Sequence, residues 1–540
     1  MKTFPLLQLF ILAIAWLAHP ASAVLPPAAP DFTAVDSYVE AQMKEARIPG
    51  VALAIVQDDH IVHLQGYGVA DPAGRPVTPQ TPFLIASTVK PFTALAIMQL
   101  VEAGRVELDA PVQRYLPWFR VADEAASTQI TVRHLLTHTS GLSEAVGNEI
   151  PVSANASEAA LEQRVRRLSA AHLNRPVGAR FEYSSANYDT LGLIVQTVSG
   201  QPYETYVQQH IFAPLDMRRT FPSVAEAEPH GLATGYRSWF GFPIPFDAPR
   251  PRAYAPSGWT TASSAEDLAH FAIAALNGGR YGNTTPLNVS PEGLVAMQQP
   301  AVRSYNDATF YGLGWNVTTM SGVPAVWAGG DAMNFKTRLV LAPEQRLAVV
   351  VLVNMNSANV NSGRFELHRG VLSLLLGQQP AAVATSHSLQ LYVTMSVILI
   401  VSLLFVAGMI RSVLRLRRRP ATPEKGHYGW RARIAPIGLP LALALTWALL
   451  LLLGLPQVGG RSLPFLLLYV PDLGYMLIAS ATLALAWGII SIFVSLSDLT
   501  SNDRFGLNSE IGDFTSEQRT LPTPPRMKTV LEMRNQISNL

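Results

Sequence analysis

Apolar positions near the beginning of the chain first follow a helical period and then alternate along strands. The first predicted helix covers residues 35–47, where apolar side chains recur at intervals of three and four: Val35, Tyr38, Val39, Met43 and Ala46. The segment VALAIVQDDHIVHLQGYGVAD then predicts two strands around a turn at Asp58-Asp59. An apolar run from Ser87 to about Ala103, closed by Gly104, predicts a second helix.

The other clear strands come late in the chain. They are GLGWNVTTM, VPAVWAGG, FKTRLVLAP and LAVVVLVNM, and an apolar helix, FELHRGVLSLLLG, follows them. The middle, roughly residues 105–300, is rich in prolines, helices and loops. We therefore predict an α/β fold in which both chain ends build one antiparallel sheet flanked by helices, with an inserted α-helical domain. A cleft between two such parts is a usual place for a functional site.

The first 23 residues have the pattern of a signal peptide. Lys2 precedes an apolar stretch over residues 6–17, and Ala21-Ser22-Ala23 forms a small-residue cleavage site. The stretch is shorter than the ~20 residues that a membrane-spanning helix needs. We expect residues 1–23 to be removed and residues 24–385 to form an exported domain.

Three uncharged apolar segments near the other end predict a membrane domain over residues 386–496. They cover 391–410, 434–455 and 473–496, and each is long enough to cross a bilayer. The connection between the first two carries eight Lys or Arg and one Glu, which favours a cytoplasmic position. The sequence thus predicts a multi-pass protein of the cell (inner) membrane, with a periplasmic or extracellular catalytic domain. The polar tail, residues 497–540, would be cytoplasmic and disordered apart from a short helix near 527–536.

Composition narrows the possible partners and chemistry. A net charge of +2 argues against a nucleic-acid partner, whereas 49% hydrophobic and 14% charged residues favour contact with a lipid bilayer. The chain has no cysteine, which excludes disulfides, thiol catalysis and cysteine-ligated zinc. His60, His63 and His134 show no metal-ligand spacing, so we expect no metal and no cofactor.

The segment IASTVKPFTAL places Ser87 three residues before Lys90 at the start of a helix. Residues three apart share one helix face, with roughly 5–6 Å between their Cβ atoms, so the amine can reach the hydroxyl. A lysine in a partly dry cleft loses pKa and can deprotonate a serine, or it can hold another base in its deprotonated form. The alternative is that Ser87 caps the helix and Lys90 is solvated. Ser-x-x-Lys alone does not decide between them.

Tyr183 precedes a second apolar helix in the segment PVGARFEYSSANYDTLGLIVQTVSG. A tyrosine beside a lysine ammonium can be driven towards phenolate and so become a general base. Unaided, such a tyrosine is more often a packed aromatic side chain with a satisfied hydroxyl.

Five ordered segments carry a resemblance to serine hydrolases of the class C β-lactamase and penicillin-binding-protein type (peptidase family S12). They are IASTVKPFTALAIMQLVEAGRVELDAPVQRYLP, ITVRHLLTHTSGL, FEYSSANYDTLGLIVQTVSG, YVQQHIFAPLDMRRTFPS and GWTTASSAEDLAHF. The resemblance covers about residues 35–360. It implies that Ser87 is the acylating serine, with Lys90 and Tyr183 as its catalytic partners. It also implies that His138, in LLTHTSGL, is structural and not part of a Ser-His-Asp triad.

Together with the three apolar C-terminal segments, SSANYD, ATGYRSWFGFP and NFKTRLVLAPEQRLAVVVLVNMNS resemble a group of membrane-anchored prodrug-activating peptidases. These enzymes, which include the colibactin-maturation peptidase, remove an N-acyl-D-amino-acid cap from nonribosomal products. In that group, residues at the positions of Ser185 and Asn334 help to hold the D-Asn side chain of the substrate. The resemblance therefore implies that Ser185 and Asn334 contact the substrate here.

The segment VWAGGDAMNF departs from the family pattern. Many relatives carry Lys-Thr-Gly or His-Gly-Gly on this strand; in one register Ala328 replaces the cation. In another register Trp327-Ala328-Gly329 resembles the Trp-x-Gly of some esterases, which makes Trp327 a candidate substrate contact. Either way, no cation on this strand binds a substrate carboxylate. The oxyanion hole would consist of backbone N–H groups of Ser87 and of Gly330 or Asp331.

These observations predict a membrane-anchored serine hydrolase that works through an acyl-enzyme. An amidase or peptidase acting on acylated D-amino-acid substrates fits best, and the substrate would be an amphiphilic small molecule or peptide. Two alternatives stay open: an esterase of the same family, and a penicillin-recognising sensor that is acylated without turnover.

Overall fold

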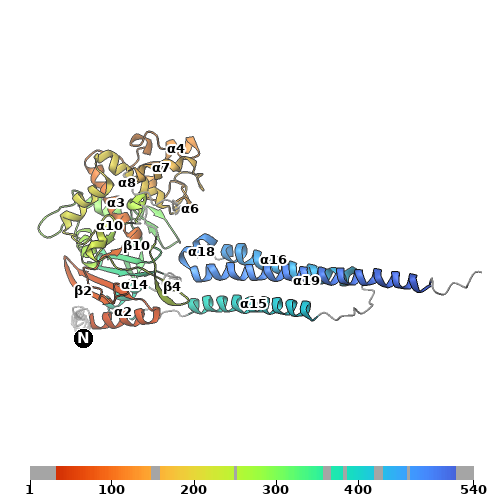
Figure 1. Cartoon of the computed structure of the whole chain (residues 1–540). Coiled ribbons are helices and arrows are strands. Elements are labelled where there is room, and N and C mark those ends of the chain that lie inside the picture. The colour runs from red at the N-terminus through yellow and green to blue at the C-terminus, as the bar shows by residue number, and fades with distance from the viewer. Residues whose placement is uncertain are drawn as a thin grey trace, which may run out of the picture. The chain divides into compact units, whose positions relative to one another are not determined.

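The structure is a computed structural model, shown in Figure 1, in which the chain forms two compact units. It describes residues 32–147, 159–248, 252–258, 260–356, 366–380, 386–418, 430–458 and 462–517. The units divide between Ala384 and Thr385. The predicted signal peptide, residues 1–23, lies outside the described residues, and so does the predicted short helix near 527–536.

An eight-stranded antiparallel sheet organises the first unit. Its order is β2-β1-β12-β11-β10-β9-β8-β7. The strands are β1 (Gly50–Gln57), β2 (His60–Gly68), β7 (Val302–Arg303), β8 (Phe310–Tyr311), β9 (Asn316–Met320), β10 (Val323–Asp331), β11 (Lys336–Ala342) and β12 (Leu347–Val353). The chain ends meet where β1 pairs with β12, from Val51 opposite Val353 to Gln57 opposite Leu347. This confirms the predicted sheet.

Helices cover both faces of the sheet, and the central strand β12 is apolar at every position. Successive side chains of a strand point to opposite faces. Along β12, one set packs against α2 (Phe32–Ala46) and α14 (Leu367–Leu375): Val349, Val351 and Val353. The other set enters the larger core that contains α3 (Lys90–Glu102): Ala348, Val350 and Leu352. Figure 1 shows α2 and α14 on one side of the strands and α3 on the other.

The segment between β2 and β7 is mainly helical, as predicted. Besides α3, its α-helices are α4 (Glu124–Gln129), α5 (Val132–Leu136), α6 (Glu144–Gly147), α7 (Ala160–Arg166), α8 (Ser185–Ser199), α9 (Tyr203–Val207), α10 (Val224–Ala227), α11 (Ala265–Leu276) and α12 (Pro291–Gln298). One small sheet lies within this segment, β3 (Phe83–Leu84) with β6 (Ala262–Ser263). Another joins the segment to the rest: β13 (Met355–Asn356) with the hairpin β4 (Tyr236–Trp239) and β5 (Phe242–Pro245).

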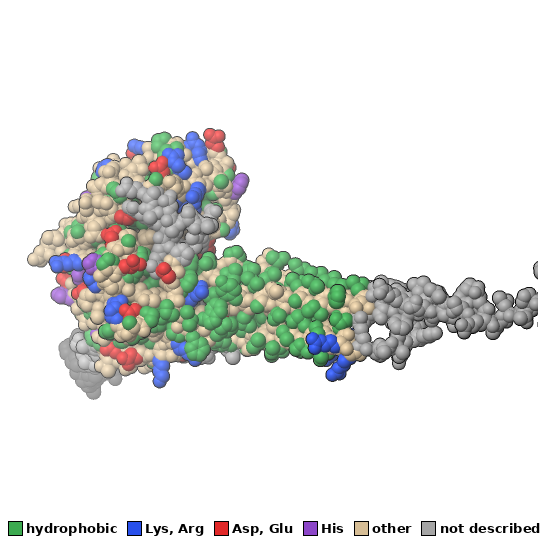
Figure 2. Space-filling model, viewed as in Figure 1, with side chains coloured by type: hydrophobic (Ala, Val, Ile, Leu, Met, Phe, Trp, Pro, Cys, Tyr) green, Lys and Arg blue, Asp and Glu red, His purple; other side chains and the backbone are tan. Residues whose placement is uncertain are grey.

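The second unit consists of helices: α15 (Ser386–Arg417), α16 (Trp430–Leu449), α17 (Leu455–Val458), α18 (Leu463–Tyr469) and α19 (Pro471–Glu517). Three stretches are long and apolar enough to cross a membrane: Gln390–Arg417, Gly438–Gln457 and Pro471–Ser497. This confirms the three predicted apolar helices. Figure 2 shows hydrophobic side chains over most of the visible face of this unit. Inside this unit a polar contact joins the three apolar helices. Ser480 Oγ in α19 accepts from Ser402 Oγ in α15 (2.8 Å) and from Trp447 Nε1 in α16 (3.0 Å).

The predicted boundary between the third apolar segment and a disordered tail differs from the structure. Helix α19 continues past residue 496 to Glu517, so the first part of the predicted tail is helical. Elongating an existing helix adds one hydrogen bond per residue ordered, which is easier than forming a new helix. A polar composition alone therefore did not reveal this extension. Residues 518–540 lie outside the described residues.

Candidate active site

Ser87 lies in a short 3₁₀ turn, η1 (Ala86–Val89), that leads directly into α3. Ala86 has a φ of +46°, in the left-handed region that residues with a Cβ rarely adopt. Backbone strain of this kind is typical of active sites, where the surrounding structure imposes it. The side chain of Ser87 does not cap either helix. The alternative reading of Ser87 as a helix cap is therefore wrong.

Two glycines allow neighbouring backbone to approach η1 closely. A Cβ on Gly330, in β10, would overlap the carbonyl oxygen of Ile85. A Cβ on Gly258 would overlap the carbonyl oxygen of Ala86, and its φ of +115° also excludes most side chains. Close packing at both glycines fixes the turn that carries Ser87 between β10 and the segment ending at Ser257.

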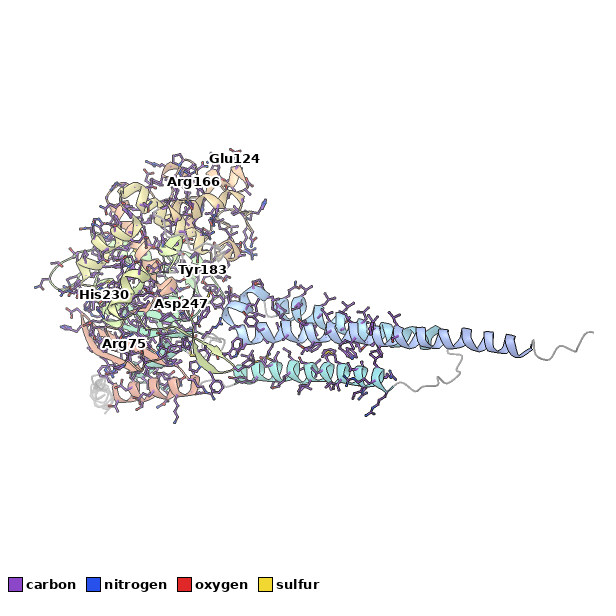
Figure 3. The ribbon with its side chains drawn as sticks, viewed as in Figure 1. Arg75, Glu124, Arg166, Tyr183, His230 and Asp247 are labelled. Carbon is purple, nitrogen blue, oxygen red and sulfur yellow. The ribbon has the colours of Figure 1, made fainter. Side chains whose placement is uncertain are left out.

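The side chains of Ser87, Lys90 and Tyr183 meet in one hydrogen-bonded group. Lys90 Nζ donates to Ser87 Oγ at 2.9 Å, and Ser87 Oγ lies 2.8 Å from the Tyr183 hydroxyl. Lys90 Nζ also donates to the backbone carbonyl of Ser257 at 2.8 Å. Lys90 is buried, whereas Ser87 and Tyr183 remain partly accessible. Figure 3 labels Tyr183 among the side chains of the first unit.

Burial gives Lys90 the properties of a base. It lowers the pKa of the Lys90 amine to about 7, because a charged ammonium is poorly solvated there, and the carboxylate of Asp189 only partly opposes this. Burial has the opposite effect on Tyr183, whose pKa is raised although the side chains of Ser87 and Ser185 counteract it. Burial therefore works against the phenolate form expected for Tyr183. Of Ser87, Lys90 and Tyr183, the Lys90 amine is the group whose pKa lies near neutral pH.

A buried ion pair lies behind Lys90, and sequence reasoning missed it. Asp189, in α8, is fully buried, and its carboxylate lies 3.4 Å from Arg164 Nε. Burial raises the pKa of Asp189 to about 6, while Arg164, Ser257 and Lys90 counteract it. Arg164 Nη2 also donates to the carbonyls of Val146 (2.5 Å) and Gly147 (3.3 Å). The signal for this ion pair in the sequence was an aspartate, Asp189, inside the apolar run that forms α8.

His138 supports Tyr183 without touching Ser87. It is fully buried, and its ring lies 4.6 Å from that of Tyr183 and 5.1 Å from that of Tyr188. Its Nδ1 accepts from the backbone N–H of Ser184 at 3.2 Å. Burial and the nearby Lys90 lower the pKa of His138 well below the usual value, so the ring is neutral. Within the described ranges, no three His, Asp or Glu side chains are grouped as metal ligands would be.

The structure distinguishes between the two registers of β10. Gly330 faces η1, and Ala328, two residues earlier, faces the same core. Trp327 faces the opposite side, where it packs in the cluster with Leu372 of α14 and lies under the guanidinium of Arg338 (5.8 Å). Trp327 thus faces away from η1, which counts against a contact with a substrate at Ser87 and favours the register in which Ala328 takes the place of the cationic residue.

Two cations on the neighbouring strand β11, Lys336 and Arg338, lie on the side of the sheet opposite to Gly330. Arg338 pairs with the Asp331 carboxylate at 3.1 Å, on the same side of the sheet as Trp327. Lys336 lies opposite Asp331 in the same register. The side chain of Asp331 is thus ion-paired. The backbone N–H groups of Ser87 and of Gly330 or Asp331 stay the predicted oxyanion donors.

The two predicted substrate contacts differ in their surroundings. Ser185 is the first residue of α8, is buried, and lies close enough to Tyr183 to influence its pKa. Asn334 is fully buried in the turn between β10 and β11, and its amide donates to the Phe246 carbonyl at 2.6 Å. Its Oδ1 has no partner among the described residues. Asn334 therefore connects the end of the β4–β5 hairpin to β10.

The sequence pattern of the family described as Beta-lactamase matches residues 35–369, more than half of the chain. The chain belongs to this family. Its members are serine hydrolases, with esterases among them. The hydrogen-bonded group of Ser87, Lys90 and Tyr183 lies inside the matched range.

Individual relatives match only part of the chain, at moderate sequence identity. Protein flp of Staphylococcus aureus (strain MW2) is 29% identical over 333 residues, which cover 60% of this chain and 64% of that protein. The chain thus spans less than two thirds of the length of this relative. Esterase EstB of Burkholderia gladioli is 36% identical over 214 residues, covering 37% of this chain and 54% of that protein.

Two solved structures share the fold of the first unit. The octameric penicillin-binding protein homologue from Pyrococcus abyssi has a TM-score of 0.56 at 27% identity, covering 66% of this chain and 79% of that one. EstCE1, a hydrolase with promiscuous acyltransferase activity, has a TM-score of 0.55 at 25% identity, covering 64% and 97%. The predicted β-lactamase-like α/β fold is confirmed.

Proposed function

We propose that the protein is a membrane-anchored serine hydrolase that works through an acyl-enzyme on Ser87. The observation that carries this proposal is the hydrogen bond between Lys90 Nζ and Ser87 Oγ, combined with a lysine pKa of about 7. A serine hydroxyl becomes an effective nucleophile only when a base takes its proton. At neutral pH a large share of the Lys90 amine is unprotonated and in contact with that hydroxyl.

In the proposed first step, neutral Lys90 accepts the hydroxyl proton while Ser87 Oγ bonds to the substrate carbonyl carbon. The negative charge moves to the carbonyl oxygen, which backbone N–H groups of Ser87 and of Gly330 or Asp331 stabilise. The tetrahedral intermediate then collapses, and the bond to the leaving group breaks. The Lys90 ammonium returns the proton to the leaving group through the Tyr183 hydroxyl, which hydrogen-bonds to Ser87.

In the second step, water attacks the acyl carbon and Lys90 accepts the proton of that water. Ser87 Oγ then leaves the acyl carbon and regains a proton. Lys90 thus serves as base and then as acid in each step, and the Tyr183 hydroxyl relays the proton to the leaving group. The buried pair of Asp189 and Arg164 keeps the surroundings of Lys90 electrically balanced while its charge changes.

Two substrate classes remain candidates. An amidase or peptidase acting on acylated D-amino-acid compounds is supported by the resemblance to prodrug-activating peptidases and by the position of Ser185 beside Tyr183. The buried Oδ1 of Asn334, which has no partner among the described residues, is a further polar group in this region. An esterase is supported by the similarity to EstB and EstCE1. The three apolar helices support anchoring, and the export of the hydrolase unit rests on the sequence pattern.

A matched substrate pair separates the classes. An N-acyl-D-asparaginyl anilide and the ester with the same acyl group would be compared by kcat/KM, in wild type and in Ser87→Ala. An amidase hydrolyses the anilide with multiple turnovers and prefers the D- over the L-isomer, whereas an esterase hydrolyses only the ester. A stoichiometric burst without turnover would favour the sensor alternative. Hydrolysis that persists in Ser87→Ala contradicts all three.

A further inference from the structure

The β4–β5 hairpin presents an aromatic outer face that the catalytic chemistry does not use. Trp239 pairs with Phe242, and Arg237 pairs with Ile244, so these four side chains share one face. The opposite face carries Tyr236 and Ser238, which are buried. The outer face should be polar if it met only water. Instead Phe242 is 61% exposed and Ile244 is 44% exposed.

The turn of the hairpin exposes a further phenylalanine in an unfavourable conformation. Phe240 has a φ of +50° and Gly241 a φ of +83°, the combination of a tight turn that asparagine and glycine adopt most easily. Phe240 is nevertheless 45% exposed. Its ring packs edge-on against Trp239, with 5.6 Å between the ring centres, yet the residue stays exposed in a backbone conformation unfavourable for it, which points to a partner outside the unit.

The charges in and beside the hairpin fit one kind of partner. From Gly235 to Phe246 the only charged residue is Arg237, whose guanidinium lies 3.9 Å from the ring centre of Phe246. Arg47 donates to the Gly241 carbonyl at 3.2 Å and lies over Phe242. Aromatic tips flanked by arginines are typical of surfaces that enter the boundary between lipid headgroups and acyl chains.

The chain itself keeps a bilayer within reach. Helix α14 packs in the core with α2 and β12, and the first candidate span begins at Gln390. Only residues 376–389 lie between them, a tether of at most about 50 Å when fully extended. We propose that the outer face of the β4–β5 hairpin, with Phe240, Phe242 and Ile244, inserts into the interfacial layer of the membrane that anchors the protein. This rests on the proposed membrane anchoring.

Insertion would also bear on substrate selection. The Phe246 carbonyl, at the end of the hairpin, accepts from Asn334, which is a proposed substrate contact. An inserted hairpin would therefore link the membrane surface, through Asn334, to the turn after β10, the strand that packs against the turn carrying Ser87. An amphiphilic substrate that partitions into the interface would then be presented on the side of the unit that faces the bilayer.

The absence of native cysteine allows a direct test in the full-length protein. A nitroxide would be attached to Phe242→Cys in nanodiscs of phosphatidylethanolamine and phosphatidylglycerol, and its collisions with oxygen and with a water-soluble nickel chelate measured. Matched controls are Val62→Cys and Val295→Cys, which are exposed apolar positions on β2 and α12 (40% and 52%). Leu403→Cys, within the first candidate span, reports hydrocarbon.

We expect the label at 242 to collide more with oxygen than with the nickel chelate, less strongly than at 403, whereas labels at 62 and 295 show the reverse. A label at 242 that behaves like those at 62 and 295, while 403 reports hydrocarbon, overturns the hairpin inference and leaves the anchoring intact. Low collision rates with both reagents at 242 also overturn it, because protein then covers the face. A water-exposed label at 403 refutes the anchoring as well.

Discussion

Lys90 should make acylation of Ser87 depend on pH with a midpoint near neutrality. The pKa of Lys90 is lowered to about 7 by burial, so the amine is mostly protonated below that pH and mostly neutral above it. Only the neutral amine can accept the serine proton. The rate should therefore rise with pH and level off above about pH 8, in contrast to a solvated lysine, for which the rise would continue to ~10.

The magnitude follows from the fraction of neutral amine. With a pKa of about 7, this fraction is about one tenth at pH 6 and about nine tenths at pH 8, so the acylation rate should rise about ninefold between them. The assay is single-turnover acylation by a chromogenic ester without titratable groups, measured from pH 5.5 to 8.5. A neutral ester is needed because the ionisation of the substrate would otherwise distort the profile.

Two lysine variants separate this effect from a general loss of structure. Lys90→Arg keeps a cation that does not deprotonate in proteins, so acylation should fall by about 10²–10⁴ at every pH. Lys336 is a matched control, since burial also lowers its pKa, to about 8, but it lies on the side of the sheet away from Ser87. Lys336→Arg should keep the wild-type profile. A flat profile in wild type, or near-normal activity of Lys90→Arg, refutes the assignment of Lys90 as the base.

Three other substitutions test parts of the same arrangement. Asp189→Asn removes the charge that favours the Lys90 ammonium, so the midpoint of the pH profile should move to lower pH. The substitution also leaves buried Arg164 without its ion-pair partner, which should lower the free energy of unfolding by about 3–5 kcal/mol in chemical denaturation. An unchanged midpoint would count against a role for this carboxylate. Gly330→Ala places a methyl group against the Ile85 backbone carbonyl, so the backbone must shift; this should reduce kcat/KM by about 10²-fold and lower the free energy of unfolding by about 1–3 kcal/mol. Wild-type kinetics would show that the close approach is dispensable. Tyr183→Phe removes the hydroxyl next to Ser87 and should reduce kcat by about 10²–10⁴, a result that a loss of only a few-fold would contradict.

The order of helices and strands was predictable because each element has its own local sequence pattern. Alternation and long apolar runs marked β1, β2 and the late strands, and length alone marked the three apolar helices. The pairing of Ser87 with Lys90 was also local, since their spacing brings them together on any helical turn. Tyr183 lies 96 residues from Ser87, and the resemblance to a family, not spacing, linked them.

What the sequence could not provide depends on packing. The pKa values of Lys90 and Tyr183 move in the directions set by burial, and burial is a property of the folded chain. The face on which Trp327 lies depends on strand register, where a shift of one residue exchanges the two sides. The pairing of Asp189 with Arg164 joins α8 to α7, and nothing in either segment alone indicates the other.

The account depends most on the claim that Ser87 is the residue that becomes acylated. Full-length protein would be incubated with a fluorophosphonate and with the preferred ester, quenched in acid during turnover, and analysed by intact mass and peptide mapping. The account predicts one adduct per chain, on the peptide containing Ser87, formed faster at pH 8 than at pH 6 and absent in Ser87→Ala. An adduct on any other residue, or turnover by Ser87→Ala at the wild-type rate, would contradict it.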